Sequence, residues 1–257
     1  MATSKPTLVI IHGAWHTPAN YSSLTTALEA AGYEVDVPRL PSMNEARPPT
    51  ADLGTDTDHV RSYVEKLVND GKAVVVIMHS YGGQVGTNAL HGLGLQERAK
   101  AAKAGGVSHL IYMCAFALPE GGSMVGKVKE FGHEDLIPLA FDFADDMTVL
   151  IRDPKTLLIG ADSGLGDDEV ESYLHKLVRW NGAAMYQEVS QCAWRTIPVS
   201  YIYTSQDMIV PLDYQKSMVE ELQKQGREVQ TYQLETSHCP NLTATADVVD
   251  IVNKVVG

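Results

Sequence analysis

Residues 73–83 read A-V-V-V-I-M-H-S-Y-G-G, an apolar run followed by His79, Ser80, Tyr81 and two glycines. The apolar run 74–78 is uninterrupted and rich in β-branched side chains, which predicts a parallel strand buried on both faces. The next segment, 84–90, is compatible with a helix, so the chain must turn sharply at the serine. Such a turn strains the serine backbone and projects its hydroxyl beyond the sheet, beside a helix N-terminus. The stretch therefore predicts an α/β fold with Ser80 as a nucleophile.

The sequence around Ser80 matches the usual G-x-S-x-G pattern only in part. Gly82 occupies the position where a side chain would obstruct the backbone, but Met78 stands at the first glycine position. A short S-x-G also occurs in ordinary structural turns. The buried strand that precedes it favours the nucleophile over the structural turn.

A serine nucleophile needs an imidazole to take its proton and a carboxylate to orient that imidazole. In sheets of this type the three groups follow the chain order serine, acid, histidine. Asp207 follows a predicted strand at 198–204, and His238 follows another at 228–234. Because functional groups gather at the carboxyl ends of parallel strands, the sequence predicts that Ser80, Asp207 and His238 are the catalytic residues.

Each of these residues also has an ordinary structural interpretation. An Asp after a strand is often a turn residue, and a lone His is often a surface or core group. If Asp207 were only a turn residue, the rival acids would be Glu120 and Asp162. His79 adjoins the nucleophile but is expected to point into the fold, and His12 is interpreted as a structural loop residue. The order and spacing of the three groups favour the catalytic interpretation.

The loop after the first predicted strand, 7–11, supplies the expected oxyanion hole. It reads H-G-A-W at 12–15, and its glycine permits a turn that aims backbone N–H groups inward. The backbone N–H groups of Ala14 and Tyr81 are therefore predicted to bind the oxyanion. Trp15 and Phe116 are predicted to bind substrate, and with Tyr81 they are expected near the mouth of an apolar pocket.

Strands and helices alternate along most of the chain. Strands are predicted near 7–11, 34–38, 73–78, 108–114, 198–204 and 228–234. Helices are predicted from 17 to Gly32, along an apolar stripe at 60–68 closed by Gly71, before Gly226 and over 248–256. The pattern predicts one domain, 1–257, with a doubly wound, mainly parallel six-stranded sheet flanked by helices and without an extra N-terminal antiparallel hairpin.

The section 118–192 interrupts this alternation and is predicted to be an inserted cap over the carboxyl ends of the strands. It holds P-E-G-G at 119–122, an acidic run at 142–146 and an amphipathic run from Val170 to Trp180. Its larger apolar residues are expected either to pack the cap onto the core or to line the pocket. These residues are Phe141, Phe143, Met147, Leu150, Trp180 and Met185.

Composition limits the classes of partner. The formal net charge of −12 argues against nucleic acid and anionic membranes, which need basic patches. The chain shows no apolar signal or membrane-spanning run, and three cysteines cannot all pair, so a cytoplasmic location with reduced thiols is expected. No metal-ligand spacing or phosphate-binding glycine motif occurs, so no metal and no cofactor are predicted. The expected partner is a small-molecule substrate, and nothing in the sequence indicates an oligomeric state.

Four motifs carry a family resemblance: H-G-A-W at 12–15, H-S-Y-G-G at 79–83, S-Q-D at 205–207 and S-H at 237–238. With them the chain resembles the α/β-hydrolase superfamily, in particular the compact subgroup of plant-type methylesterases and hydroxynitrile lyases. In those lyases a lysine follows the catalytic histidine and a threonine follows the leading histidine of the first loop. Here these positions hold Cys239 and Gly13. The resemblance therefore implies an esterase rather than a cyanohydrin lyase.

The leading functional hypothesis is a serine carboxylesterase or lactonase that forms an acyl-enzyme with a small, fairly apolar substrate. Within the same scaffold, a C–C bond hydrolase or lyase and a non-hydrolytic cyclase or isomerase stay open as alternatives. A receptor-like protein that only binds its ligand is a further class, which the presence of all three predicted triad residues disfavours. Scaffold alone does not decide among these activities, because the site sets the function.

Overall fold

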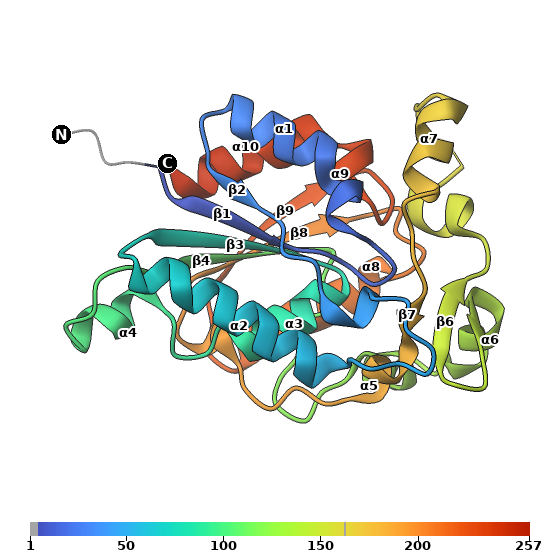
Figure 1. The fold of residues 1–257 in the computed structure, drawn as a ribbon, viewed down its shortest axis with the longest axis horizontal. Coiled ribbons are helices and arrows are strands. Elements are labelled where there is room, and N and C mark those ends of the chain that lie inside the picture. The colour runs from blue at the N-terminus through green and yellow to red at the C-terminus, as the bar shows by residue number, and fades with distance from the viewer. Residues whose placement is uncertain (1–4, 162) are drawn as a thin grey trace.

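The computed structural model describes residues 5–161 and 163–257 and has a six-stranded sheet at its centre (Figure 1). The sheet order is β2-β1-β3-β4-β8-β9, and every neighbouring pair is parallel. The strands are β1 (Thr7–Ile11), β2 (Val35–Asp36), β3 (Ala73–His79), β4 (Gly106–Met113), β8 (Val199–Thr204) and β9 (Val229–Leu234). The predicted doubly wound α/β fold is confirmed. The edge strand β2 is shorter than predicted, and Pro38, which lacks an N–H, follows it closely.

Helices cover both faces of this sheet (Figure 1). One face packs on α1 (Ser22–Ala30) and α10 (Thr245–Val256), and the other on α2 (Leu53–Asn69), α3 (Tyr81–Ala89) and α8 (Leu212–Lys224). Strand β3 serves both layers, because Val76 belongs to the buried cluster on the α2 side and its neighbour Ile77 to the cluster on the α1 side. This two-sided burial explains the uninterrupted apolar run in the sequence.

Helix ends follow local sequence signals. The side chain of Asp52 accepts a hydrogen bond from the Thr55 N–H at the start of α2, which is a standard N-cap. Gly71, just beyond the end of α2, has a φ of 86°, a conformation that glycine adopts without a Cβ penalty. Two further short helices are α4 (Leu95–Lys100) and α9 (Pro240–Thr243).

The segment between β4 and β8 contains a second, smaller sheet. Strands β5 (Phe141–Phe143), β6 (Thr148–Ile151) and β7 (Trp180–Asn181) pair antiparallel in that order. Helices α5 (Met124–Glu130), α6 (Ile137–Ala140) and α7 (Asp167–Leu174) complete the segment. The amphipathic run predicted from Val170 to Trp180 is divided, because α7 ends at Leu174 and Trp180 belongs to β7. Figure 1 shows these elements beside the carboxyl ends of the large sheet.

All three cysteines, Cys114, Cys192 and Cys239, are buried and unpaired. Within residues 5–161 and 163–257, no helix combines the length and the apolar character needed to cross a membrane.

Candidate active site

Ser80 occupies the sharp turn between β3 and α3. Its backbone has φ 53° and ψ −122°, a region that residues with a side chain adopt only under strain. A Cβ at Gly82 would lie 2.2 Å from the carbonyl oxygen of Ile11, so the turn requires glycine there. Met78, the departure from the usual motif, is accommodated because Gly86 leaves room for it; a Cβ at Gly86 would lie 2.3 Å from its sulfur.

The structure brings Ser80, His238 and Asp207 into one hydrogen-bonded chain. His238 Nε2 lies 2.9 Å from Ser80 Oγ, and His238 Nδ1 lies 2.7 Å from Asp207 Oδ2. A carboxylate only accepts, so Nδ1 carries the proton and Nε2 is left to accept from the serine hydroxyl. The side chains of His238 and Asp207 are 1% and 0% exposed, so this chain is shielded from water. The arrangement can deprotonate the serine.

Asp207 also holds the loop on which it lies. Its Oδ1 accepts hydrogen bonds from the backbone N–H groups of Ile209 and Val210, both at 2.8 Å. Its Oδ2 accepts one from the Thr204 hydroxyl at 3.0 Å, in addition to the one from His238. These bonds satisfy a buried carboxylate and set its orientation toward the imidazole.

The loop after β1 passes close to the serine. A Cβ at Gly13 would lie 3.1 Å from the Ser80 Cβ, so this backbone passes directly beside the nucleophile. Trp15 on the same loop has a φ of 62°, a second strained non-glycine position. Tyr81 is the first residue of α3, and its N–H belongs to the amides that a helix N-terminus leaves unpaired. The backbones of Ala14 and Tyr81 thus lie on the two segments that meet at Ser80.

His79 and Tyr21 connect the loop to the turn. The Gly13 N–H donates to Tyr21 Oη at 2.9 Å, and Tyr21 Oη lies 2.5 Å from His79 Nδ1. His79 Nε2 lies 2.7 Å from the carbonyl oxygen of His238, which can only accept. Neutral His79 therefore carries its proton on Nε2 and accepts the Tyr21 proton on Nδ1. As predicted, His79 points into the fold. There it holds the loop at Gly13 through Tyr21, and it holds the backbone carbonyl of His238 directly.

Three buried histidines surround this site and resist protonation. His12, His16 and His79 are at most 1% exposed. Burial lowers the pKa of His12 to about 4 and that of His16 to about 3, and it lowers the pKa of His79 well below its usual range. All three imidazoles are therefore neutral at pH 7 in the folded protein.

These histidines should make the protein acid-sensitive. Below pH 6.5 the unfolded chain takes up protons that the folded one excludes, so the free energy of unfolding falls as pH decreases, by about 3 kcal/mol for His12 alone at pH 4. Burial raises the pKa of Asp56 to about 6, so this carboxyl raises the free energy of unfolding as pH falls from 6 to 4. It is one group against three histidines. Urea unfolding at several pH values measures the slope. His16→Asn should reduce it, whereas the exposed control His175→Gln should not; an equal slope in His16→Asn contradicts this account.

Sequence reasoning missed a buried carboxyl behind the turn. Tyr81 Oη donates to Asp56 Oδ2 at 2.8 Å, and Ser42 donates to the same carboxyl through its N–H and its hydroxyl. Trp180 Nε1 in turn donates to Ser42 Oγ at 3.1 Å. The network joins the turn to β7 of the insertion. Tyr81 is fully buried and does not reach the pocket mouth, which corrects the placement expected for its side chain.

Ser80 opens into a narrow apolar cavity of about 40 Å³, here called the chamber. Trp15 and Phe116, the predicted substrate-binding residues, both line it, and Phe141 stacks on Trp15 with ring centroids 5.3 Å apart. None of the described lining residues carries a charge. The full lining is Trp15, Ser80, Phe116, Met124, Val125, Val128, Ile137, Phe141, Met185 and Ile209.

Four of the six larger apolar residues of the predicted cap take one of the two roles left open by the sequence, and Met147 and Leu150 take neither. Phe141 and Met185 line the chamber. Trp180 is fully buried against Trp15 and Tyr81. Phe143 packs on the core as a partly buried side chain, while Met147 and Leu150 are each 38% exposed.

Of the rival acids, Glu120 is exposed and forms an ion pair with Arg195 at 2.5 Å, which lowers the pKa of Glu120 to about 2. Asp162 lies outside the described residues.

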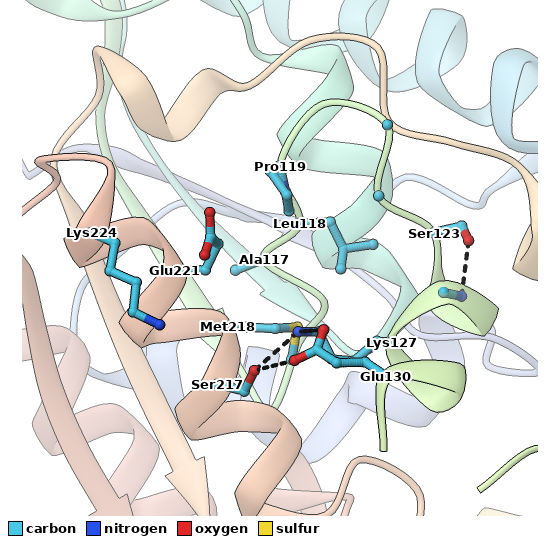
Figure 2. A pocket seen from close by; sticks show the side chains of 13 residues that line it. Ala117, Leu118, Pro119, Ser123, Lys127, Glu130, Ser217, Met218, Glu221 and Lys224 are labelled. Carbon is cyan, nitrogen blue, oxygen red and sulfur yellow. Dashed lines mark hydrogen bonds and ion pairs between the residues drawn. The ribbon is translucent and has the colours of Figure 1, made fainter. Parts of the chain in front are cut away.

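Figure 2 shows a separate, polar pocket of about 330 Å³ between α5 and α8, which shares no lining residue with the chamber. There Lys127 contacts Glu130 at 2.6 Å and Ser217 at 3.1 Å, so its charge is already neutralised.

One group of side chains has the composition of a metal site. Potential ligand atoms of His79, Cys114 and His238 all lie within 4.8 Å of one another. Both ring nitrogens of each histidine are already hydrogen-bonded to protein atoms. Nδ1 of His79 contacts Tyr21, Nδ1 of His238 contacts Asp207, and the two Nε2 atoms have partners of their own. Metal binding would break the chain that joins His238 to Ser80, so the group does not fit a metal site.

Comparisons with known proteins agree with the observed fold. A family model described as "Alpha/beta hydrolase family" matches residues 8–251. The chain is 28% identical over 260 residues to "Probable hydrolase R7" of Phoma sp., covering 99% of both chains. Polyneuridine aldehyde esterase is similar with a TM-score of 0.76 at 18% identity, covering 98% of this chain and 100% of that chain. The methylesterase MES16 from Arabidopsis has a TM-score of 0.72 at 19% identity, covering 97% and 98%. At these identities the structural likenesses show the fold alone.

Proposed function

The chain belongs to the alpha/beta hydrolase family, and we propose that it hydrolyses a carboxylic ester or lactone of a small, fairly apolar substrate through an acyl-enzyme on Ser80. The observation that carries this proposal is the row of hydrogen bonds from Ser80 Oγ through His238 to Asp207. Its Ser80 end lines the apolar chamber. A neutral ester carbonyl suits such a lining, because the described chamber residues offer no charge to pair with an ionic substrate.

In the proposed reaction, Ser80 Oγ attacks the carbonyl carbon while its proton passes to His238 Nε2. The oxyanion is held by the backbone N–H groups of Ala14 and Tyr81, and the imidazolium by Asp207. The tetrahedral intermediate expels the alkoxide, which takes the proton from Nε2. Water then gives a proton to Nε2 and attacks the acyl carbon. Ser80 leaves as the second intermediate collapses and recovers its proton from Nε2.

Cleavage of a cyanohydrin is disfavoured by the surroundings of His238. The next residue, Cys239, is buried, and its sulfur faces His16 Nε2 at 3.6 Å, so it supplies no cation for a leaving cyanide. Neutral His16 supplies none either, because burial holds its pKa at about 3.

A substrate panel tests the proposal directly. We expect turnover of p-nitrophenyl esters or aryl lactones, together with covalent labelling of Ser80 by a fluorophosphonate. A 1,3-diketone in the same panel tests hydrolytic C–C cleavage, which would use the same triad. Turnover of the diketone without any ester or lactone would contradict the proposed function and support the C–C hydrolase.

Asp207→Asn should lower kcat by about 10² to 10⁴ with little change in KM. The amide keeps an oxygen for the Ile209 and Val210 N–H groups but removes the charge that stabilises imidazolium. Steady-state kinetics on the best ester measures the effect, and Asp213→Asn, an exposed carboxyl in the first turn of α8, is the matched control. A loss below about threefold, with a large loss in Glu120→Gln, would reassign the acid.

A further inference from the structure

The chamber at Ser80 adjoins a second apolar cavity, here called the groove. Four side chains line both cavities and form the boundary between them: Val128, Ile137, Phe141 and Ile209. The groove has a volume of about 80 Å³ and is larger than the chamber, which has about 40 Å³. An apolar molecule at Ser80 that is too long for the chamber therefore meets the groove directly beyond these four side chains.

The groove is apolar along its walls and includes aromatic side chains. Leu136 and Met208 border it and are 53% and 57% exposed, an unusual position for large apolar side chains. Tyr214 is buried and stacks on His133, with ring centroids 5.8 Å apart, and its hydroxyl lies 2.8 Å from His133 Nδ1. No acidic or basic side chain other than His133 is among the described residues that line the groove.

We propose that the groove binds a long, uncharged apolar arm of the substrate whose ester group lies at Ser80. This inference rests on the proposed ester hydrolysis and adds the substrate class: an ester with one short group held in the chamber and one extended aliphatic or aromatic group in the groove. The shared wall of the two cavities points to this occupant, since Ile209, two residues after Asp207, lines both.

The position of Ile209 links recognition of the arm to the catalytic chain. The Ile209 N–H donates to Asp207 Oδ1, the carboxyl that also binds His238 through Oδ2. An arm that packs on Ile209 therefore contacts the loop that holds the acid. Apolar contact there should raise kcat/KM, since the arm is bound in both the ground state and the transition state.

The test compares kcat/KM for p-nitrophenyl butyrate and octanoate in the wild-type protein. Full burial of a methylene is worth about fourfold, and half of that energy in an open groove is worth about twofold. The four extra methylenes of octanoate should therefore favour it by about fifteenfold. An octanoate analogue that ends in a carboxylate should lose this gain, because the groove has no cation for it. Octyl acetate, in which the long arm is on the alcohol, distinguishes an acyl arm from an alcohol arm.

A matched pair of variants on one short helix localises the arm. Ala140 lines the groove but not the chamber, whereas its neighbour Leu139 lines neither and is 70% exposed. Ala140→Trp should reduce the octanoate-to-butyrate ratio to about two or less, while Leu139→Trp should keep it. Met208→Trp, at an exposed position, repeats the test should Ala140→Trp fail to fold. A ratio kept in Ala140→Trp, or lost equally in Leu139→Trp, overturns the proposal.

A measurement without turnover separates this inference from the proposed function. p-Nitrophenyl octyl ether has no cleavable carbonyl, and calorimetric titration should show about fifteenfold tighter binding than for the butyl ether. Equal affinities of the two ethers overturn the groove assignment even in a protein that hydrolyses esters. Tighter octyl binding with no ester turnover and no labelling of Ser80 supports the groove and contradicts the proposed function.

Discussion

Ser80→Ala should lower kcat for the best ester substrate by about 10⁴ to 10⁶, to the rate that the remaining site supports without a nucleophile. The loss is this large because the acyl-enzyme route needs a bond from Ser80 Oγ to the substrate, and no neighbouring group replaces it. In the variant, His238 keeps its hydrogen bond to Asp207, so the side chains of both residues stay in place.

Two measurements check this result. A fluorophosphonate should add one mass increment to the wild-type protein, located at Ser80 by peptide mapping, and none to the variant. Ser217→Ala, in the polar pocket shown in Figure 2, is the control and should keep both labelling and rate. Labelling of another residue, or a variant that retains its activity, contradicts the assignment of Ser80.

The features that could be predicted from the sequence have strong local signals. A strand buried on both faces leaves an uninterrupted apolar run, and a backbone that passes within van der Waals contact of another leaves a glycine. Gly82 is such a position, because any Cβ there would collide with the Ile11 carbonyl. Placement after strand ends then sufficed to bring Asp207 and His238 together with Ser80, since parallel strands bring their carboxyl ends to one edge.

The small sheet of the insertion lacked such signals. Strand β7 is only two residues long, and no periodicity is detectable over that length. Asp56 was also missed, because a single acidic residue on an amphipathic helix is normally solvated. Its burial depends on Tyr81 and on Ser42, partners distant in the sequence, so only the folded arrangement shows it.

The role of His238 predicts a loss as large as that of Ser80, and a loss that does not add to it. His238→Ala should lower kcat by about 10⁴ to 10⁶, and the double variant with Ser80→Ala should be no slower than either single variant, because the two side chains act as one unit. Labelling of Ser80 by the fluorophosphonate should slow as well, since Nε2 accepts the Ser80 proton.

The His238→Ala variant should keep its fold, which makes this prediction decisive for the base. The contacts that hold this loop to His79 and Cys114 use the backbone carbonyl of residue 238, and alanine retains that carbonyl. Thermal unfolding measures the fold, and the exposed His175→Ala is the control that should change neither stability nor rate. A folded His238→Ala protein at the wild-type rate would place the base elsewhere. Additive losses in the double variant would show that Ser80 and His238 act independently, and the hydrogen bond between them would then have no catalytic role.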